Sequence, residues 1–181
     1  MQDDDVLLRR AGTAEGYLCI KLEHDGDMTI LTQPGLIKQI IEALGLCNKY
    51  STEISTPTES VALPRDGDGQ PISGVINYSS VIGMLLYLRH TRPDIAFAVH
   101  QCARCTFEPK QSHEKALKRI GRYLMGIIDK GLIMCPTYNF NIDCYPDADF
   151  AGSWGHEHPQ DPHCVRSRTG YVITFAGCPV L

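Results

Sequence analysis

The sequence predicts an α+β protein with a β-hairpin and helix first, a block of three helices next, and a partial sheet last. Three observations support this fold class. Apolar residues recur at helical spacing between positions 77 and 130. Short runs rich in β-branched and aromatic residues lie on both sides of that block, and turns containing glycine or proline bound them. The 181 residues, 43% of them hydrophobic, suffice for one ordinary domain or two small pieces.

The N-terminal part divides into a leader and a hairpin followed by a helix. Residues 1–15 show no periodicity, and we expect them to form a disordered leader. Within residues 16–46, Tyr17–Glu23 and Met28–Thr32 predict two strands joined by a tight turn. A helix with one apolar stripe then ends at Gly45, a residue typical of helix C-termini.

Residues 47–76 differ in composition from the segments on either side. Serine, threonine, proline, aspartate and glycine dominate, and no apolar period is present. A segment of this length without regular structure is typical of a functional loop or of a boundary between two pieces. We interpret it as a linker between the hairpin part and the helical part.

The central segment, residues 77–130, predicts three consecutive helices. Proline is favoured at the first helical position, so Pro93 is expected to begin the second helix. Ser112 is expected to cap the third helix through its hydroxyl. The apolar stripe of that third helix consists of Leu117, Ile120, Leu124 and Ile127.

The opposite side of the third helix is basic. Lys115, Lys118, Arg119 and Arg122 recur at spacings that place them on one helix face. The whole chain has a formal net charge of −4, yet residues 77–130 hold 9 basic and 4 acidic side chains. The helix face could therefore contact phosphates, although a solvated surface is the commoner meaning of such a face.

The C-terminal part, residues 131–181, predicts short strands. Gly131–Cys135 and Phe140–Tyr145 are candidate strands, and Thr169–Ala176 is expected to pair with the second of these. Two or three strands cannot bury both faces of a sheet, so we expect a truncated domain here.

Several stretches resemble one known family. They are GYLCIKLE, LTQPGLIKQIIEALGL, STPTES, YSSVIGMLLYLRHTRPDIAFAVH, KALKRIGRYLMG, YPDADFAG and SRTGYVITFAG. From about Gly16 to Leu181 the chain resembles the Pol polyprotein of copia-type LTR retrotransposons, near the end of reverse transcriptase and the start of ribonuclease H. The TRPDI and DADFAG segments at this mutual distance are the most specific part of the resemblance.

The resemblance implies a multidomain enzyme that copies RNA into DNA and degrades the RNA strand of the hybrid, with Mg²⁺ held by aspartates. It also implies that the hairpin is the end of the polymerase palm, that residues 77–130 are thumb- or connection-like, and that residues 131–181 begin a ribonuclease H domain. The family pattern has leucine-glycine where this chain has Leu18 and Cys19. This difference weakens the case for a close backbone approach to a primer.

The catalytic carboxylates of that family are incomplete here. No Tyr-x-Asp-Asp turn precedes Tyr17, and Asp3, Asp4 and Asp5 fit a solvated acidic run. By resemblance Asp147 corresponds to the first metal-binding carboxylate of ribonuclease H, so it is the candidate catalytic and Mg²⁺-binding residue. One carboxylate cannot hold a pair of catalytic ions, and we expect no independent catalysis and no stably bound cofactor.

The leading hypothesis is therefore a retrotransposon-derived fragment that binds an RNA–DNA hybrid through the four cations of the third helix. Further Pol polyprotein domains are possible partners. Two alternatives stay open: a nuclease completed in trans around Asp147, and a noncatalytic protein-interaction module.

The eight cysteines form no compact framework, and no positively charged apolar leader precedes them, which favours reduced thiols in the cytoplasm or nucleus. No apolar run reaches the roughly 20 residues of a membrane span. Cys102 and Cys105 with nearby histidines permit a zinc site, but buried thiols are the preferred interpretation. The loop from His156 to Cys164 raises the same question, and a solvated loop is preferred there.

Overall fold

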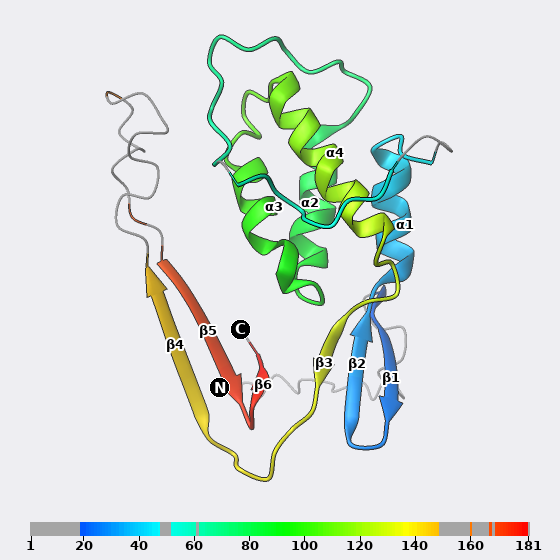
Figure 1. Ribbon diagram of the computed structural model, residues 1–181, viewed down its shortest axis with the longest axis vertical. Coiled ribbons are helices and arrows are strands. Elements are labelled where there is room, and N and C mark those ends of the chain that lie inside the picture. The colour runs from blue at the N-terminus through cyan, green and yellow to red at the C-terminus, as the bar shows by residue number, and fades with distance from the viewer. Residues whose placement is uncertain are drawn as a thin grey trace, which may run out of the picture.

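The computed structural model describes residues 19–47, 52–60, 62–148, 160, 167 and 169–180. Within these ranges the chain forms four α-helices and two three-stranded antiparallel sheets (Figure 1). The predicted α+β class is confirmed. The expected leader, residues 1–15, lies outside the described residues.

The first sheet joins the N-terminal hairpin to a strand from much later in the chain. Strands β1 (Lys21–Asp25) and β2 (Met28–Thr32) form the predicted hairpin. The second strand has the expected bounds, whereas β1 is described only from Lys21. Strand β3 (Leu132–Met134) pairs antiparallel with β2, so the sheet order is β1-β2-β3.

The backbone before β1 bears on the departure from the family pattern. Cys19 has a φ angle of 61°. This left-handed region disfavours residues with a Cβ and favours glycine. The position where the family pattern has glycine is therefore strained by cysteine in this chain.

The helices begin and end at recognisable signals. Helix α1 (Pro34–Ala43) starts with proline. Helix α2 (Tyr78–Leu88) is capped by Asn77, whose side chain accepts a hydrogen bond from the backbone N–H of Ser80 at 3.0 Å. The predicted second helix consists of a 3₁₀ turn, η2 (Pro93–Ile95), followed by α3 (Ala96–Ala103). Helix α4 spans Gln111–Met125.

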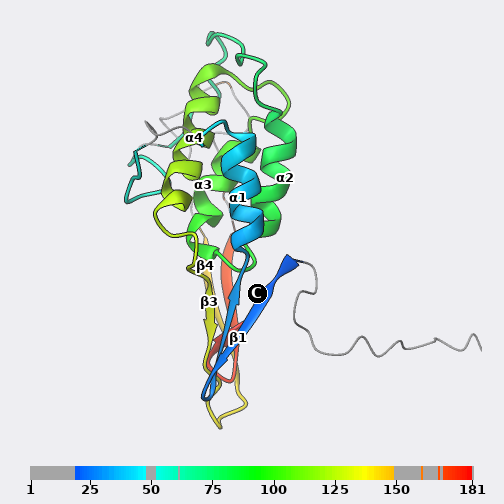
Figure 2. The ribbon, with the colours of Figure 1, turned by 90° about the vertical axis from the view of Figure 1, so that its right-hand side faces the viewer.

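The four helices enclose one hydrophobic core. Helix α1 packs against α2 and α4, and α3 packs against the same two helices (Figure 2). The residues that are essentially inaccessible to solvent include Ile37, Ile40, Leu85, Leu88, Ile95, Val99, Leu117, Ile120 and Leu124. The predicted apolar stripe of α4 is thus buried, except that Ile127 lies beyond the helix and is only partly buried.

Helices α1 and α4 approach each other closely at Gly121. A Cβ added there would lie 2.5 Å from Leu44 Cδ1 and 2.6 Å from Leu46 Cδ1. A larger residue would have to push these leucines aside. Glycine at this position therefore allows α1 to pack directly on α4.

This packing crosses the expected linker. Residues from α1 share the core with residues from α2, α3 and α4. Leu63 and Ile72 of residues 47–76 pack against the same core, and Ile76 is buried in it. The expected linker does not separate α1 from the other helices in packing, and the five-part division of the chain remains a prediction.

The TRPD motif makes a buried joint between α2, η2 and α4. The Arg92 side chain is only 4% exposed and donates hydrogen bonds to Asp94 at 2.9 and 2.6 Å. It also donates to the Ile127 carbonyl at 3.1 Å, and its guanidinium lies 5.8 Å from the centre of the Tyr123 ring. The Tyr123 hydroxyl donates to Asp94 at 2.7 Å. This motif therefore holds the helices together.

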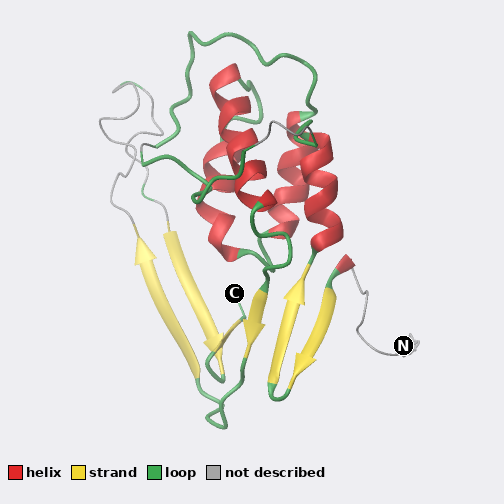
Figure 3. Ribbon diagram, turned by 45° about the vertical axis from the view of Figure 1, so that its right-hand side comes forward, coloured by secondary structure: helices red, strands yellow, loops and turns green. Residues whose placement is uncertain are grey.

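The second sheet has the order β4-β5-β6 and is mostly exposed (Figure 3). Strands β4 (Ile142–Ala148) and β5 (Thr169–Phe175) pair antiparallel as predicted, and β6 (Cys178–Pro179) follows β5. Every residue of β4 is exposed, with Ile142 at 73% and Tyr145 at 60%. Neither face of this sheet is covered by a helix (Figures 1 and 3).

One predicted helix cap is wrong. Helix α4 begins one residue earlier than expected, and Lys110 occupies the cap position instead of Ser112. The backbone N–H of Lys110 donates to Nδ1 of His113 at 2.9 Å. An imidazole nitrogen thus takes the orphan donor that we expected a serine hydroxyl to satisfy.

Candidate nucleic-acid interface

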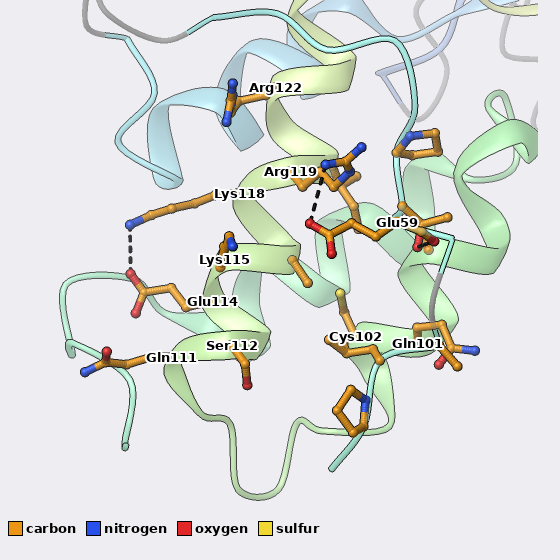
Figure 4. Close-up of a pocket in the computed structure, with 18 of the residues that line it drawn as sticks. Glu59, Gln101, Cys102, Gln111, Ser112, Glu114, Lys115, Lys118, Arg119 and Arg122 are labelled. Carbon is orange, nitrogen blue, oxygen red and sulfur yellow. Dashed lines mark hydrogen bonds and ion pairs between the residues drawn. The ribbon is translucent and has the colours of Figure 1, made fainter. Parts of the chain in front are cut away.

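The four predicted phosphate-binding residues lie on α4 and face a segment of the same chain. We call residues 52–60 and 62–76 the strap. The strap runs past α4, and the side chains of the four cations project toward it (Figure 4). The helix brings the four cations together, as predicted, but it does not leave all of them free.

The two arginines bind the first part of the strap. Arg122 donates from Nε to the carbonyl of Thr52 at 2.7 Å and from Nη2 to the hydroxyl of the same residue. Arg119 donates from Nη2 to the Thr56 hydroxyl at 2.9 Å, and its Nη1 lies 3.6 Å from a Glu59 oxygen. A phosphate would have to compete with these acceptors.

Lys118 is held by a carboxylate that also binds the strap. Its ammonium donates to Glu114 at 2.8 Å. Glu114 in addition accepts the backbone N–H and the hydroxyl of Ser73 at 3.0 Å each. The hydrogen bond from Lys118 is the main reason that the pKa of Glu114 lies below its usual value, with the bonds from Ser73 acting in the same direction.

The start of α4 anchors the later part of the strap. His113 is completely buried, and its Nδ1 accepts a proton from the Lys110 backbone, so the ring proton lies on Nε2. Nε2 therefore donates to the Pro64 carbonyl at 2.9 Å. Ser112 donates to Asp66, and the Gln111 N–H donates to the Gln70 carbonyl at 2.9 Å. The expected packing role of His113 against the preceding helix is replaced by a hydrogen-bonding role.

Lys115 differs from the other three cations. It is exposed, and it makes no ion pair or hydrogen bond with any residue in the described part of the chain. Its charge is available to a ligand without breaking an existing contact. The strap contacts of the neighbouring arginines were missed by sequence reasoning, although acidic Glu59 and Asp66 opposite a basic helix were a usable signal.

Asp147 does not form a complete metal site with the described residues. It lies near the end of β4, exposed, opposite Gly170 of β5. Asp143 is four residues away on the same strand, which corresponds to roughly 13 Å. Among the described residues, no group of three or more His, Cys, Asp or Glu side chains is placed to hold a metal ion. These residues do not fit the Mg²⁺ pair that the family chemistry requires.

The cysteines of the predicted CxxC pair are buried thiols. Cys102 and Cys105 are 2% and 6% exposed. Burial raises the pKa of the Cys102 thiol to about 12, so the thiol stays protonated at neutral pH. The loop from His156 to Cys164 lies almost entirely outside the described residues. None of the described helices is long and apolar enough to cross a membrane.

Comparison with known proteins finds relatives among transposon polyproteins. The chain is 32% identical over 144 residues to the retrovirus-related Pol polyprotein from transposon RE1 of Arabidopsis thaliana, covering 79% of this chain and 9% of that polyprotein. It is 29% identical over 179 residues to the corresponding polyprotein from transposon TNT 1-94 of Nicotiana tabacum, covering 94% and 13%. An uncharacterized mitochondrial protein of Arabidopsis thaliana is 27% identical over 180 residues, covering 96% and 68%.

Neither a protein-family model nor a solved structure matches the chain. The matched polyproteins are one class, the Pol polyproteins of transposable elements, and the chain spans only 9% and 13% of the two named above. Within this class, the chain is a distant homologue of the copia-type retrotransposon Pol polyproteins.

Proposed function

We propose that this chain is a noncatalytic, nucleic-acid-binding piece of a copia-type Pol polyprotein, corresponding to the end of reverse transcriptase and the start of ribonuclease H. Its ligand is an RNA–DNA hybrid, whose phosphates contact the cationic face of α4. Other Pol polyprotein domains are its expected partners. The residues assigned to phosphate contact are Lys115, Lys118, Arg119 and Arg122.

The observation that carries this proposal is the exposed, unengaged Lys115 on a helix face with three further cations. Phosphates attract such a face because bound counterions are released from the nucleic acid. The homology to Pol polyproteins supplies a reason for the ligand to be nucleic acid.

The strap limits this binding. Glu59 and the two threonines occupy the arginines at positions 119 and 122. A hybrid gains the contact to Lys115 directly and gains the arginine contacts only when the strap moves away. We therefore expect weak binding at physiological salt and a steep increase at low salt.

Fluorescence anisotropy with a labelled RNA–DNA hybrid tests the proposal. Lys115→Gln should weaken binding and lower the slope of log Kd against log salt by about one. Glu59→Gln should strengthen binding, because it removes a carboxylate that competes with phosphate for Arg119. Lys38→Gln, which changes an exposed lysine on α1, is the matched control and should leave both values unchanged.

The proposal fails if the hybrid does not bind at low salt. It also fails if Lys115→Gln and Lys38→Gln weaken binding equally, because the loss would then follow net charge and not the face of α4.

A second candidate, a nuclease completed in trans, is favoured by the uncovered sheet. Tyr145, Tyr171 and Val172 are about half exposed or more on the two strands that hold Asp147, so this sheet offers apolar surface to another polypeptide. Mixing the chain with other Pol polyprotein segments and Mg²⁺ should then cleave the RNA of a labelled hybrid. Asp147→Asn should abolish this cleavage, and an inactive mixture would remove the candidate.

A further inference from the structure

A cavity of about 720 Å³ lies between the strap and helices α3 and α4 (Figure 4). Its apolar lining consists of Leu46, Leu63, Ala98, Cys102, Ala116 and Ile120. Its charged lining consists of Lys115, Lys118, Arg119, Arg122, Glu59 and Glu114. The volume falls within the range of small-molecule sites, and four cations against two carboxylates favour an anionic ligand.

Arg119 has hydrogen-bonding capacity left in this cavity. Its Nε–H is buried and has no acceptor among the residues that the structure describes. The contact of its Nη1 with Glu59, at 3.6 Å, is an ion pair too long to be a hydrogen bond. A buried donor without an acceptor is unfavourable by about 1–3 kcal/mol. A ligand oxygen at this position would remove that penalty.

Lys115 provides the second contact for the same ligand. It lies one helical turn before Arg119, lines the same cavity, and has no partner in the described part of the chain. Two cations at this spacing on a helix repel each other. An anion bound between them would accept hydrogen bonds from both and relieve the repulsion.

We propose that the cavity binds a small organic phosphate of the size of a nucleoside monophosphate. The phosphate lies between Arg119 and Lys115, where the guanidinium supplies the donor geometry that phosphate oxygens match. The flat ring packs against the apolar side chains of Ala98, Cys102 and Ile120. This site is distinct from hybrid binding, because the strap forms one wall of the cavity, whereas a hybrid that reaches the arginines has to move the strap.

Isothermal titration calorimetry of the full chain with adenosine monophosphate tests this inference. Adenosine and inorganic phosphate are the separate probes for the ring and the anion, and each should bind at least tenfold more weakly than the nucleotide. Ala116→Leu fills part of the cavity without changing charge and should weaken nucleotide binding at least tenfold. Ala43→Leu, at an exposed position of α1, is the matched control and should bind as the unchanged chain does.

The two proposals fail separately. Ala116→Leu keeps all four cations, so it should leave hybrid binding unchanged while nucleotide binding falls. Should circular dichroism show that this variant is misfolded, Arg119→Lys keeps the charge but removes the Nε–H donor, and it should also weaken nucleotide binding. Undetectable nucleotide binding, or equal binding by the folded variants and the unchanged chain, overturns the inference whatever the hybrid does.

Discussion

Replacing Arg92 with methionine is expected to destabilise the helical core strongly. The substitution keeps the length of the side chain but removes its charge and all its hydrogen bonds. The guanidinium is almost fully buried and bonds both oxygens of Asp94 as well as the Ile127 carbonyl. Methionine would leave the carboxylate and the carbonyl without these donors.

The expected loss follows from these contacts. Removing one partner of a buried ion pair destabilises a protein by about 3–5 kcal/mol. The Asp94 side chain is 39% exposed, so water can solvate it and the lower end of that range applies. We therefore expect a loss of about 3 kcal/mol, a large part of the roughly 5–15 kcal/mol that stabilises a typical domain.

Urea unfolding followed by far-UV circular dichroism measures this loss. Arg89→Met is the matched control, because Arg89 is only half-buried and its bond to His100 is exposed. That control should change the free energy of unfolding by less than about 1 kcal/mol. A double-mutant cycle with Asp94→Asn should show coupling between Arg92 and Asp94.

The same joint predicts a dependence of stability on acid pH. Burial alone would raise the pKa of Asp94, but hydrogen bonds from Arg92 and Tyr123 outweigh it and hold the pKa below the usual 3.8. The stabilisation is complete above pH 3.8 and is lost as pH falls through the lower pKa of the folded state. Arg92→Met should remove this part of the acid dependence. A loss below about 1 kcal/mol with unchanged acid dependence would refute the argument.

Three further predictions concern single positions. Gly121→Ala should destabilise the fold by about 1–3 kcal/mol in thermal unfolding, whereas Gly83→Ala, in an exposed part of α2 with free space around it, should stabilise it by up to about 1 kcal/mol. Cys19→Gly should stabilise by about 1 kcal/mol, because it relieves a positive φ angle, and an unchanged melting temperature would contradict that strain. In alkylation followed by peptide mass spectrometry, exposed Cys47 should react quickly and buried Cys102 only on unfolding, so equal rates would contradict the burial.

Local periodicity explains what the sequence predicted well. The bounds of β2 and the buried stripe of Leu117, Ile120 and Leu124 depend on neighbouring residues along the chain, which a sequence pattern records directly. The pairing of β4 with β5 followed from the composition of two runs, and the register then placed Asp147 opposite Gly170.

The strap could not be predicted in the same way. Its contacts join residues more than forty positions apart, such as Ser73 with Glu114 and Thr52 with Arg122. A segment without an apolar period looks like a linker when only its own composition is considered. Hydrogen bonds to buried groups, for example from His113 to Pro64, fix it to α4 instead.

The residues that carry the family resemblance have structural roles in this chain. Thr91 of the TRPD motif donates to Gln33 of the TQPG motif at 2.8 Å, so two of the quoted stretches meet in the core. Arg92 and Asp94 form the joint with α4. Such contacts are needed for the fold whether or not any chemistry takes place. Resemblance at these positions therefore supports a shared fold, while activity has to be judged from the carboxylates, of which Asp147 is the one in a matching place.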